Sequence, residues 1–145
     1  NRLENLQFAK KFIQEHGFKV TISTISESGA ASTYNNETEV IWLNSCPKNL
    51  FWNNPTRLMG YNFKEGFLSS PNPMAALYHE MAHGLFTVNH KWIKKQQQTA
   101  LKVSRYGSSN PREFVAEVYA GIKTGQSYSD DVMELFKSIS ILKIK

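Results

Sequence analysis

The order of the elements that the sequence predicts indicates an α+β fold. An amphipathic segment comes first, two β-rich segments follow it, and helical periodicity fills the second half of the chain. Strands that precede a run of helices are typical of α+β proteins. The 145 residues also suffice for one hydrophobic core. We therefore predict a single compact domain over residues 1–145, with an N-terminal helix and a small mixed β-sheet followed by a helical half.

The N-terminal third predicts one helix and two strands. Apolar side chains recur at helical spacing and stop before Gly17, a residue that suits a helix end; they are Leu3, Leu6, Ala9, Phe12 and Ile13. Residues 18–26 ("FKVTISTIS") alternate apolar and polar side chains, and residues 38–45 ("TEVIWLNS") are β-branched and aromatic, so both predict strands. Residues 26–30 and 34–37 predict turns.

The middle of the chain predicts loops, and helices resume after it. Residues 46–72 are dense in Pro, Asn, Gly and Ser, and they predict long loops with one short strand around residues 65–70 ("EGFLSS"). Asn72 can then cap a helix whose first residue is Pro73. The apolar stripe of this helix is formed by Met74, Leu77, Tyr78, Met81 and Leu85. Further helices are expected over residues 90–103, 111–122 and 129–142.

Charge and composition narrow the expected partners. The formal net charge is +5, from 17 Lys and Arg against 12 Asp and Glu. The basic runs "HKWIKK" and "KSISILKIK" lack the interleaved aromatic and glycine residues of nucleic-acid platforms, so nucleic-acid binding is not expected. No apolar run is long enough to span a bilayer, and the single cysteine, Cys46, cannot form an internal disulfide. The expected partner is a peptide or protein substrate.

The start of the chain suggests a longer parent protein. It carries neither an initiator Met nor a basic-then-apolar leader, and its first residues already show helical spacing. We therefore expect a fragment of a longer protein, either cytoplasmic or delivered as part of that larger protein.

The segment "HEMAH", residues 79–83, carries the clearest chemical signal. His79 and His83 are four residues apart, so on a helix they lie on one face and can bind the same metal ion. Glu80 lies about 100° further round the helix, where its carboxylate can take a proton from an attacking water molecule. Zinc hydrolases need these parts, together with a third ligand. The segment therefore predicts a zinc (Zn²⁺) site.

Spacing alone leaves the third ligand open. His90 is one residue out of register for a downstream histidine ligand of the metzincin type. Glu113 and Glu117 are four residues apart and share one face of the helix expected over residues 111–122. Glu113 also fits a different role, because Asn110-x-x-Glu113 is a capping-box pattern. His90, Glu113 and Glu117 therefore all stay candidates on this ground.

The two motifs together resemble a known group of enzymes. "HEMAH" followed by "RYGSSNPREFVAEVYAG" is similar to the gluzincin metallopeptidases, and within them to the catalytic domain of anthrax lethal factor and to peptidase domains encoded by phages and mobile elements. The resemblance covers residues 67–122. The positions that match the second motif of that family are Tyr106, Gly107, Asn110, Glu113, Phe114, Ala116 and Glu117.

The resemblance implies a compact zincin-like domain and a metal site with assigned ligands. It implies that His79, His83 and Glu113 bind zinc and that Glu80 acts as general base. Zincins also bind extended peptide along an edge strand above the metal. Residues 39–45 ("EVIWLNS") or the region around 65–70 could provide that strand, and the latter is the expectation.

The same resemblance implies two supporting roles and one activity. Tyr106 would donate its hydroxyl to the oxyanion that forms during attack on the peptide carbonyl, and Glu117 would accept a hydrogen bond from a ligand imidazole. The implied activity is that of a zinc-dependent endopeptidase. The alternatives are an SprT-like protease associated with nucleic acid, with a third histidine ligand such as His90, and an inactive zinc-containing interaction domain.

Overall fold

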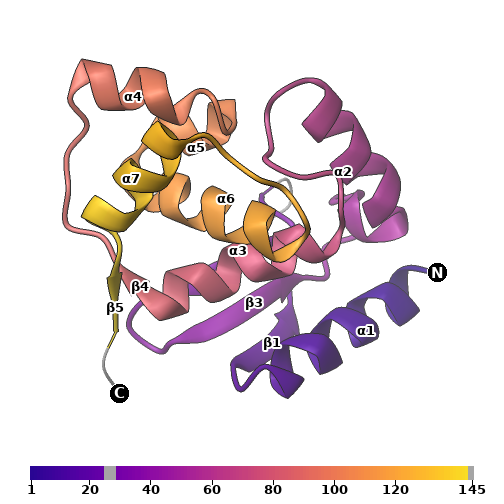
Figure 1. Ribbon diagram of the computed structural model, residues 1–145. Helices are drawn as coiled ribbons and strands as arrows, with labels where there is room; N and C mark the ends of the chain where they lie inside the picture. The colour runs from indigo at the N-terminus through magenta and orange to yellow at the C-terminus, as the bar shows by residue number, and fades with distance from the viewer. Residues whose placement is uncertain (25–28, 144–145) are drawn as a thin grey trace.

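The computed structural model describes residues 1–24 and 29–143 and confirms the α+β fold. Figure 1 shows α3 (Met74–Leu85) across the middle of the molecule. The strands β1 (Lys19–Ser23) and β3 (Val40–Asn44) and the helix α1 (Arg2–Glu15) lie on one side of it. On the other side lie α4 (Lys94–Ala100), α5 (Arg105–Ser109), α6 (Pro111–Lys123) and α7 (Asp130–Ile139). The helix α3 is therefore shared by both halves.

The main sheet is small and mixed, as the sequence predicts. Its strand order is β1-β3-β2, where β2 is Ser32–Asn35. β1 runs parallel to β3, with Val20 opposite Ile41, whereas β2 runs antiparallel to β3, with Tyr34 opposite the same residue. β3 is the central strand, and its side chains Ile41 and Leu43 are fully buried. β2 is therefore an edge strand.

Two larger clusters of buried apolar side chains form the cores of the two halves of the molecule. The first joins α1, β3 and α3, and consists of Leu6, Ala9, Ile13, Ile41, Leu43, Trp52, Leu77 and Met81. The second joins α4, α6 and α7, and consists of Ala100, Phe114, Val115, Val118, Val132, Leu135 and Ile139. A smaller cluster of Met59, Ala75 and Ala120 brings α2 (Pro55–Lys64), α3 and α6 together. The helices that carry the two sequence motifs thus pack against each other.

The prediction for residues 46–72 was largely wrong. This region contains a short 3₁₀ helix, η1 (Phe51–Asn53), and the ten-residue helix α2, and residues 65–70 form no strand. Asn54 caps α2 by accepting a hydrogen bond from the amide of Arg57 at 3.2 Å, and Pro55 takes the first turn. Asn-Pro is a helix-start signal. The many turn-forming residues around this signal led to the prediction of a loop instead of a helix.

The prediction for the region before β3 was incomplete. β2 was not predicted, and the turn expected over residues 34–37 lies instead at residues 36–39, between β2 and β3. There the Asn35 side chain accepts hydrogen bonds from the amides of Glu37 and Thr38, at 2.9 and 3.0 Å. Of the turn predicted over residues 26–30, residues 26–28 lie outside the described part of the chain, and so do the last residues of the strand predicted over 18–26.

The helices predicted over residues 90–103 and 129–142 are shorter in the structure. The basic helix spans Lys94–Ala100, and α7 ends at Ile139. Ser140 has an extended backbone, and β5 (Ile141–Leu142) pairs antiparallel with β4 (Phe86–Thr87), directly after α3. Beyond β5, Lys143 donates its amide to the Leu85 carbonyl at 2.8 Å and its Nζ to the His83 carbonyl at 2.9 Å. The end of the described chain thus closes the end of α3.

In the part of the chain that the structure describes, no helix is both long enough and apolar enough to cross a bilayer.

The closeness of α3 to the sheet depends on Gly84. A β-carbon at Gly84 would lie 2.8 Å from Cε1 of Phe18 and 3.2 Å from Cε1 of Tyr34. Both distances are shorter than ordinary carbon–carbon contacts, so a side chain here must displace one ring or both. The absence of a side chain at Gly84 therefore lets β2 lie beside the helix that carries His79 and His83.

Gly84→Ala is expected to lower the free energy of unfolding by about 1 kcal/mol or more, because overpacking a buried contact costs more than the helix gains. Gly60→Ala is the matched control, since Gly60 also lies in a helix and a β-carbon there would meet nothing within 4 Å. It should raise the free energy of unfolding by about 0.5–1 kcal/mol. Urea denaturation measures both, and equal shifts in one direction would contradict the packing argument.

Candidate metal centre

The three residues implied as zinc ligands converge at one point. His79 and His83 come from α3, and Glu113 comes from the first turn of α6. Oε1 of Glu113 lies 3.1 Å from Nε2 of His79 and 2.9 Å from Nε2 of His83. One nitrogen or oxygen from each residue lies within 4.8 Å of the others, close enough to share one metal ion. Among the described residues, no other group of three or more His, Cys, Asp or Glu side chains has this arrangement.

The position of Glu113 follows from the start of α6. Asn110 caps this helix by accepting a hydrogen bond from the Glu113 amide at 3.0 Å, and Pro111 occupies the first turn. The cap is thus made by the side chain of Asn110 and the backbone of Glu113. The carboxylate of Glu113 points to the two imidazoles instead. The capping pattern and the ligand geometry are therefore compatible in one residue.

Glu117 contacts the other nitrogen of His79. Its Oε2 accepts a hydrogen bond from Nδ1 of His79 at 2.8 Å, while its Oε1 accepts from the Ser69 amide and the Ser104 hydroxyl, each at 3.0 Å. The Glu117 residue is only 3% exposed. A carboxylate at this position fixes a proton on Nδ1, so Nε2 is the nitrogen of His79 that faces the site. Glu117 therefore orients the His79 ring and does not belong to the group of His79, His83 and Glu113 that could hold a metal ion.

The charged groups of the centre shift one another's proton affinities. Burial alone would lower the pKa of His79, but hydrogen bonds to Glu113 and Glu117 outweigh it and hold the pKa well above its usual value. Burial alone would raise the pKa of Glu113, but its bonds to His79 and His83 dominate and hold that pKa far below its usual range. Glu113 is therefore an anion at neutral pH and suits a cation.

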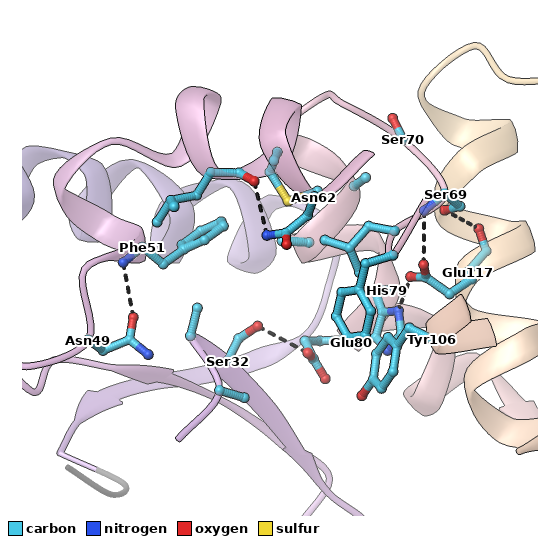
Figure 2. A pocket seen from close by; sticks show the side chains of 18 of the residues that line it. Ser32, Asn49, Phe51, Asn62, Ser69, Ser70, His79, Glu80, Tyr106 and Glu117 are labelled. Carbon is cyan, nitrogen blue, oxygen red and sulfur yellow. Dashed lines mark hydrogen bonds and ion pairs between the residues drawn. The ribbon is translucent and has the colours of Figure 1, made fainter. Parts of the chain in front are cut away.

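Glu80 lies beside the centre and is buried. Ser32 of β2 donates its hydroxyl to Oε2 of Glu80 at 3.0 Å, and burial is the main cause that raises the pKa of Glu80. A carboxylate with a raised pKa holds a proton more strongly than an exposed one. Figure 2 shows Glu80 between Ser32 and His79, at the edge of the cavity. This position suits proton transfer next to the ligand cluster.

Tyr106 of α5 completes the group. Its hydroxyl donates a hydrogen bond to Oε2 of Glu113, and its ring stacks on His79 with ring centres 5.4 Å apart and planes 13° from parallel. Burial, followed by the bond to Glu113, raises the pKa of Tyr106 above its usual value. The phenol therefore stays protonated and can act as a donor at neutral pH.

A cavity of about 600 Å³ opens beside these residues. His79, Glu80 and Tyr106 line it together with residues of β2, η1, α2, α6 and the first turn of α3, and of the loops before β2, before η1 and before α3. Figure 2 shows these three side chains at one end of the cavity and Phe51 and Asn49 at the other. Most of the lining is apolar, including Phe51, Leu58, Met59, Leu68, Ala75 and Ala76. Such a cavity suits an apolar side chain of a ligand.

Neither segment that was expected to bind substrate as an edge strand has a free strand edge. β3 is central in the sheet and has no free edge, and residues 65–70 form no strand. The edge strand next to α3 is β2: Ser32 bonds to Glu80, and the Tyr34 ring centre lies 6.4 Å from that of His83. The one signal in the sequence was the short β-prone run "STYN" before the turn at residues 36–39.

His90, the histidine candidate for the third ligand, lies outside the ligand cluster. Its Nε2 pairs with Oε1 of Gln96 at 2.7 Å, and the group of ligand atoms contains Glu113 in its place. A third histidine ligand is the feature that distinguishes the SprT-like alternative. The geometry therefore favours the arrangement with a glutamate ligand.

Comparison of the chain with known protein families, with curated proteins and with solved structures finds no match. The likeness to gluzincins therefore stays a prediction that depends on the motif residues. The function has to be inferred from the geometry of the site.

Proposed function

We propose that this chain is a zinc-dependent endopeptidase, which hydrolyses peptide bonds with an activated water molecule. The observation that carries the proposal is the convergence of His79, His83 and Glu113, with Glu80 and Tyr106 on the same side, at one end of an apolar cavity. These five residues supply the ligands, the base and the oxyanion donor that this chemistry requires.

The residues present fit zinc in number and in chemistry. Two imidazole nitrogens and one carboxylate suit a borderline-soft ion better than magnesium, which prefers oxygen ligands alone. The region is also rich in acid: the carboxylates of Glu80, Glu113 and Glu117 surround two imidazoles and are largely buried. A divalent cation would offset this charge. When bound, zinc would polarise the scissile carbonyl and make a water molecule more acidic.

Glu80 acts as the general base in this proposal. Its carboxylate takes one proton from the attacking water and later gives it to the leaving amine nitrogen, so the same group serves both steps. The raised pKa of Glu80 favours this exchange, because a stronger base takes the proton more readily. Its bond from Ser32 holds one oxygen and leaves the other for the water.

Tyr106 acts as the donor to the oxyanion. Attack on the carbonyl places negative charge on its oxygen, and an O–H donor already fixed in position stabilises that charge. The ring of Tyr106 is held against His79, and its hydroxyl reaches the same carboxylate that joins the two imidazoles. A carbonyl oxygen bound near Glu113 would therefore lie within reach of the Tyr106 hydroxyl.

The substrate would be an extended peptide. β2 is an edge strand beside α3, so its outer backbone groups can pair with a substrate main chain. A side chain next to the scissile bond would then enter the cavity, whose apolar lining favours an apolar residue.

The protein is expected to bind one zinc ion per chain, and Glu113→Ala should lower zinc affinity by roughly 100-fold or more, since it removes a direct ligand. Asn110→Ala is the matched control: it removes the cap of the same helix, costs about 1 kcal/mol of stability and should keep the metal. Elemental analysis after dialysis gives both results. Retention of zinc by Glu113→Ala, with loss in Glu117→Ala or His90→Ala, would show that another residue is the ligand.

Glu80→Gln is expected to keep zinc and to lower peptide hydrolysis by about 10² to 10⁴, because the amide cannot accept the proton. Glu134→Gln makes the same chemical change at an exposed position on α7 and should leave the rate unchanged. Cleavage of a peptide library, read by mass spectrometry, measures the rates. Equal rates for the parent and Glu80→Gln would exclude Glu80 as the base.

Tyr106→Phe is expected to lower kcat by roughly 10² to 10³ with little change in KM or zinc content, since the lost hydroxyl acts only as charge develops. The control is Tyr61→Phe, which removes the same hydroxyl from a residue that is 58% exposed on α2. Steady-state kinetics on one peptide measures both. A loss confined to KM would mean that Tyr106 binds substrate and does not stabilise the transition state.

A further inference from the structure

The ring of Tyr106 has a second aromatic neighbour besides His79. Phe67 stacks on it with ring centres 5.4 Å apart and planes 25° from parallel. The His79 ring is stacked on Tyr106 at the same centre-to-centre distance, so two flat partners contact the Tyr106 ring. His79 is itself fixed by Glu117. Phe67 therefore supplies a second stacking contact that limits movement of the Tyr106 ring.

Phe67 also contacts Arg105. The guanidinium of Arg105 lies 5.7 Å from the centre of the Phe67 ring and donates to the carbonyl of Glu65. Two backbone hydrogen bonds join the same segments, from Arg105 to the Gly66 carbonyl at 2.9 Å and from Tyr106 to the Phe67 carbonyl at 3.1 Å. The loop before Phe67 and the start of α5 thus form one fixed unit.

Burial does not explain the aromatic side chain at this position. Phe67 is 39% exposed, and it is not part of the buried apolar clusters of the described residues. It lines the cavity together with Tyr106, so its ring also occupies space into which the Tyr106 ring could otherwise turn. α5 is only five residues long, and the contacts that fix the Tyr106 ring come from other elements: the stacked rings of His79 and Phe67 and the carboxylate of Glu113.

We propose that Phe67 is a positioning residue that holds the Tyr106 hydroxyl in place for the oxyanion. The proposal rests on the proposed function, because Tyr106 must be the donor for its position to matter. An aromatic pair in offset contact favours one relative placement of the rings. Loss of that contact allows the hydroxyl to move by a distance on the order of 1 Å, which can cost about 10²-fold in rate.

The first test compares kcat in variants with zinc bound. Phe67→Ala should lower kcat by roughly 10- to 100-fold at unchanged zinc content, whereas Phe67→Tyr keeps the ring and should retain the parental kcat. The matched control is Phe63→Ala, since Phe63 is the same residue type with the same 39% exposure but lies on α2. A fall in kcat of the same size in Phe63→Ala, or a normal kcat in Phe67→Ala, would overturn the proposal.

A double-mutant cycle separates an effect through Tyr106 from an independent one. If Phe67 acts through the Tyr106 hydroxyl, Phe67→Ala should change kcat no further once Tyr106→Phe is present. Multiplication of the two losses would overturn the proposal. A normal kcat in Tyr106→Phe alone would instead remove the donor role and with it that part of the proposed function. The two failures are therefore distinguishable.

A further readout needs neither zinc nor substrate. In metal-free protein with labelled tyrosine, the ring signals of Tyr106 can be assigned by their loss in Tyr106→Phe. Stacking between two aromatic rings shifts these signals, so Phe67→Ala should move them toward the values of an exposed tyrosine, while Phe63→Ala should leave them in place. Unchanged Tyr106 signals in Phe67→Ala would show that Phe67 does not fix the ring and would overturn the proposal.

Discussion

The buried carboxylate of Glu117 is the interaction on which the rest of the centre depends. A buried charge is stable only when hydrogen bonds replace the water that it loses, and Glu117 obtains them from three separate segments. They are the His79 ring on α3, the amide of Ser69 in the loop before it, and the hydroxyl of Ser104 at the start of α5. The hydrogen bonds of this one carboxylate therefore fix the His79 ring, the loop at Ser69 that lines the cavity, and the start of α5.

The hydrogen bond from Ser104 to Glu117 also positions α5 relative to α6. Ser104 bonds to Glu117 and also accepts from the Gly107 amide at 2.9 Å, so the first turn of α5 is capped and held against α6 by one hydroxyl. Tyr106 lies within that turn. The hydrogen bond between Ser104 and Glu117 therefore helps to set the distance between Glu113 and the Tyr106 hydroxyl. This explains how a helix of only five residues can carry a well-placed side chain.

The parts of this arrangement that depend on local rules could be predicted from the sequence. The spacing of His79 and His83 and the Asn110-Pro111 helix start are local features, and both are found as predicted. Spacing could not separate Glu113 from Glu117, because the difference between them lies in which nitrogen of His79 each one faces. β2 was missed for a related reason: a run of four residues is too short to predict a strand by itself, and its conformation comes from pairing with β3 and packing on α3.

The pairing of β4 with β5 has a consequence for the biosynthesis of the protein. Lys143 holds the carbonyl of His83 across a separation of 60 residues, so the end of the metal-site helix is completed by a segment that leaves the ribosome long after the helix itself. Domains emerge from their N-terminal side, and contacts between distant segments form late because their loops are costly to close. The nascent chain can therefore fold α1, the sheet and most of α3 before His83 is fully secured. A nascent chain that has not yet reached β5 would contain the HEMAH segment without the contacts of β5 and Lys143 at the end of α3.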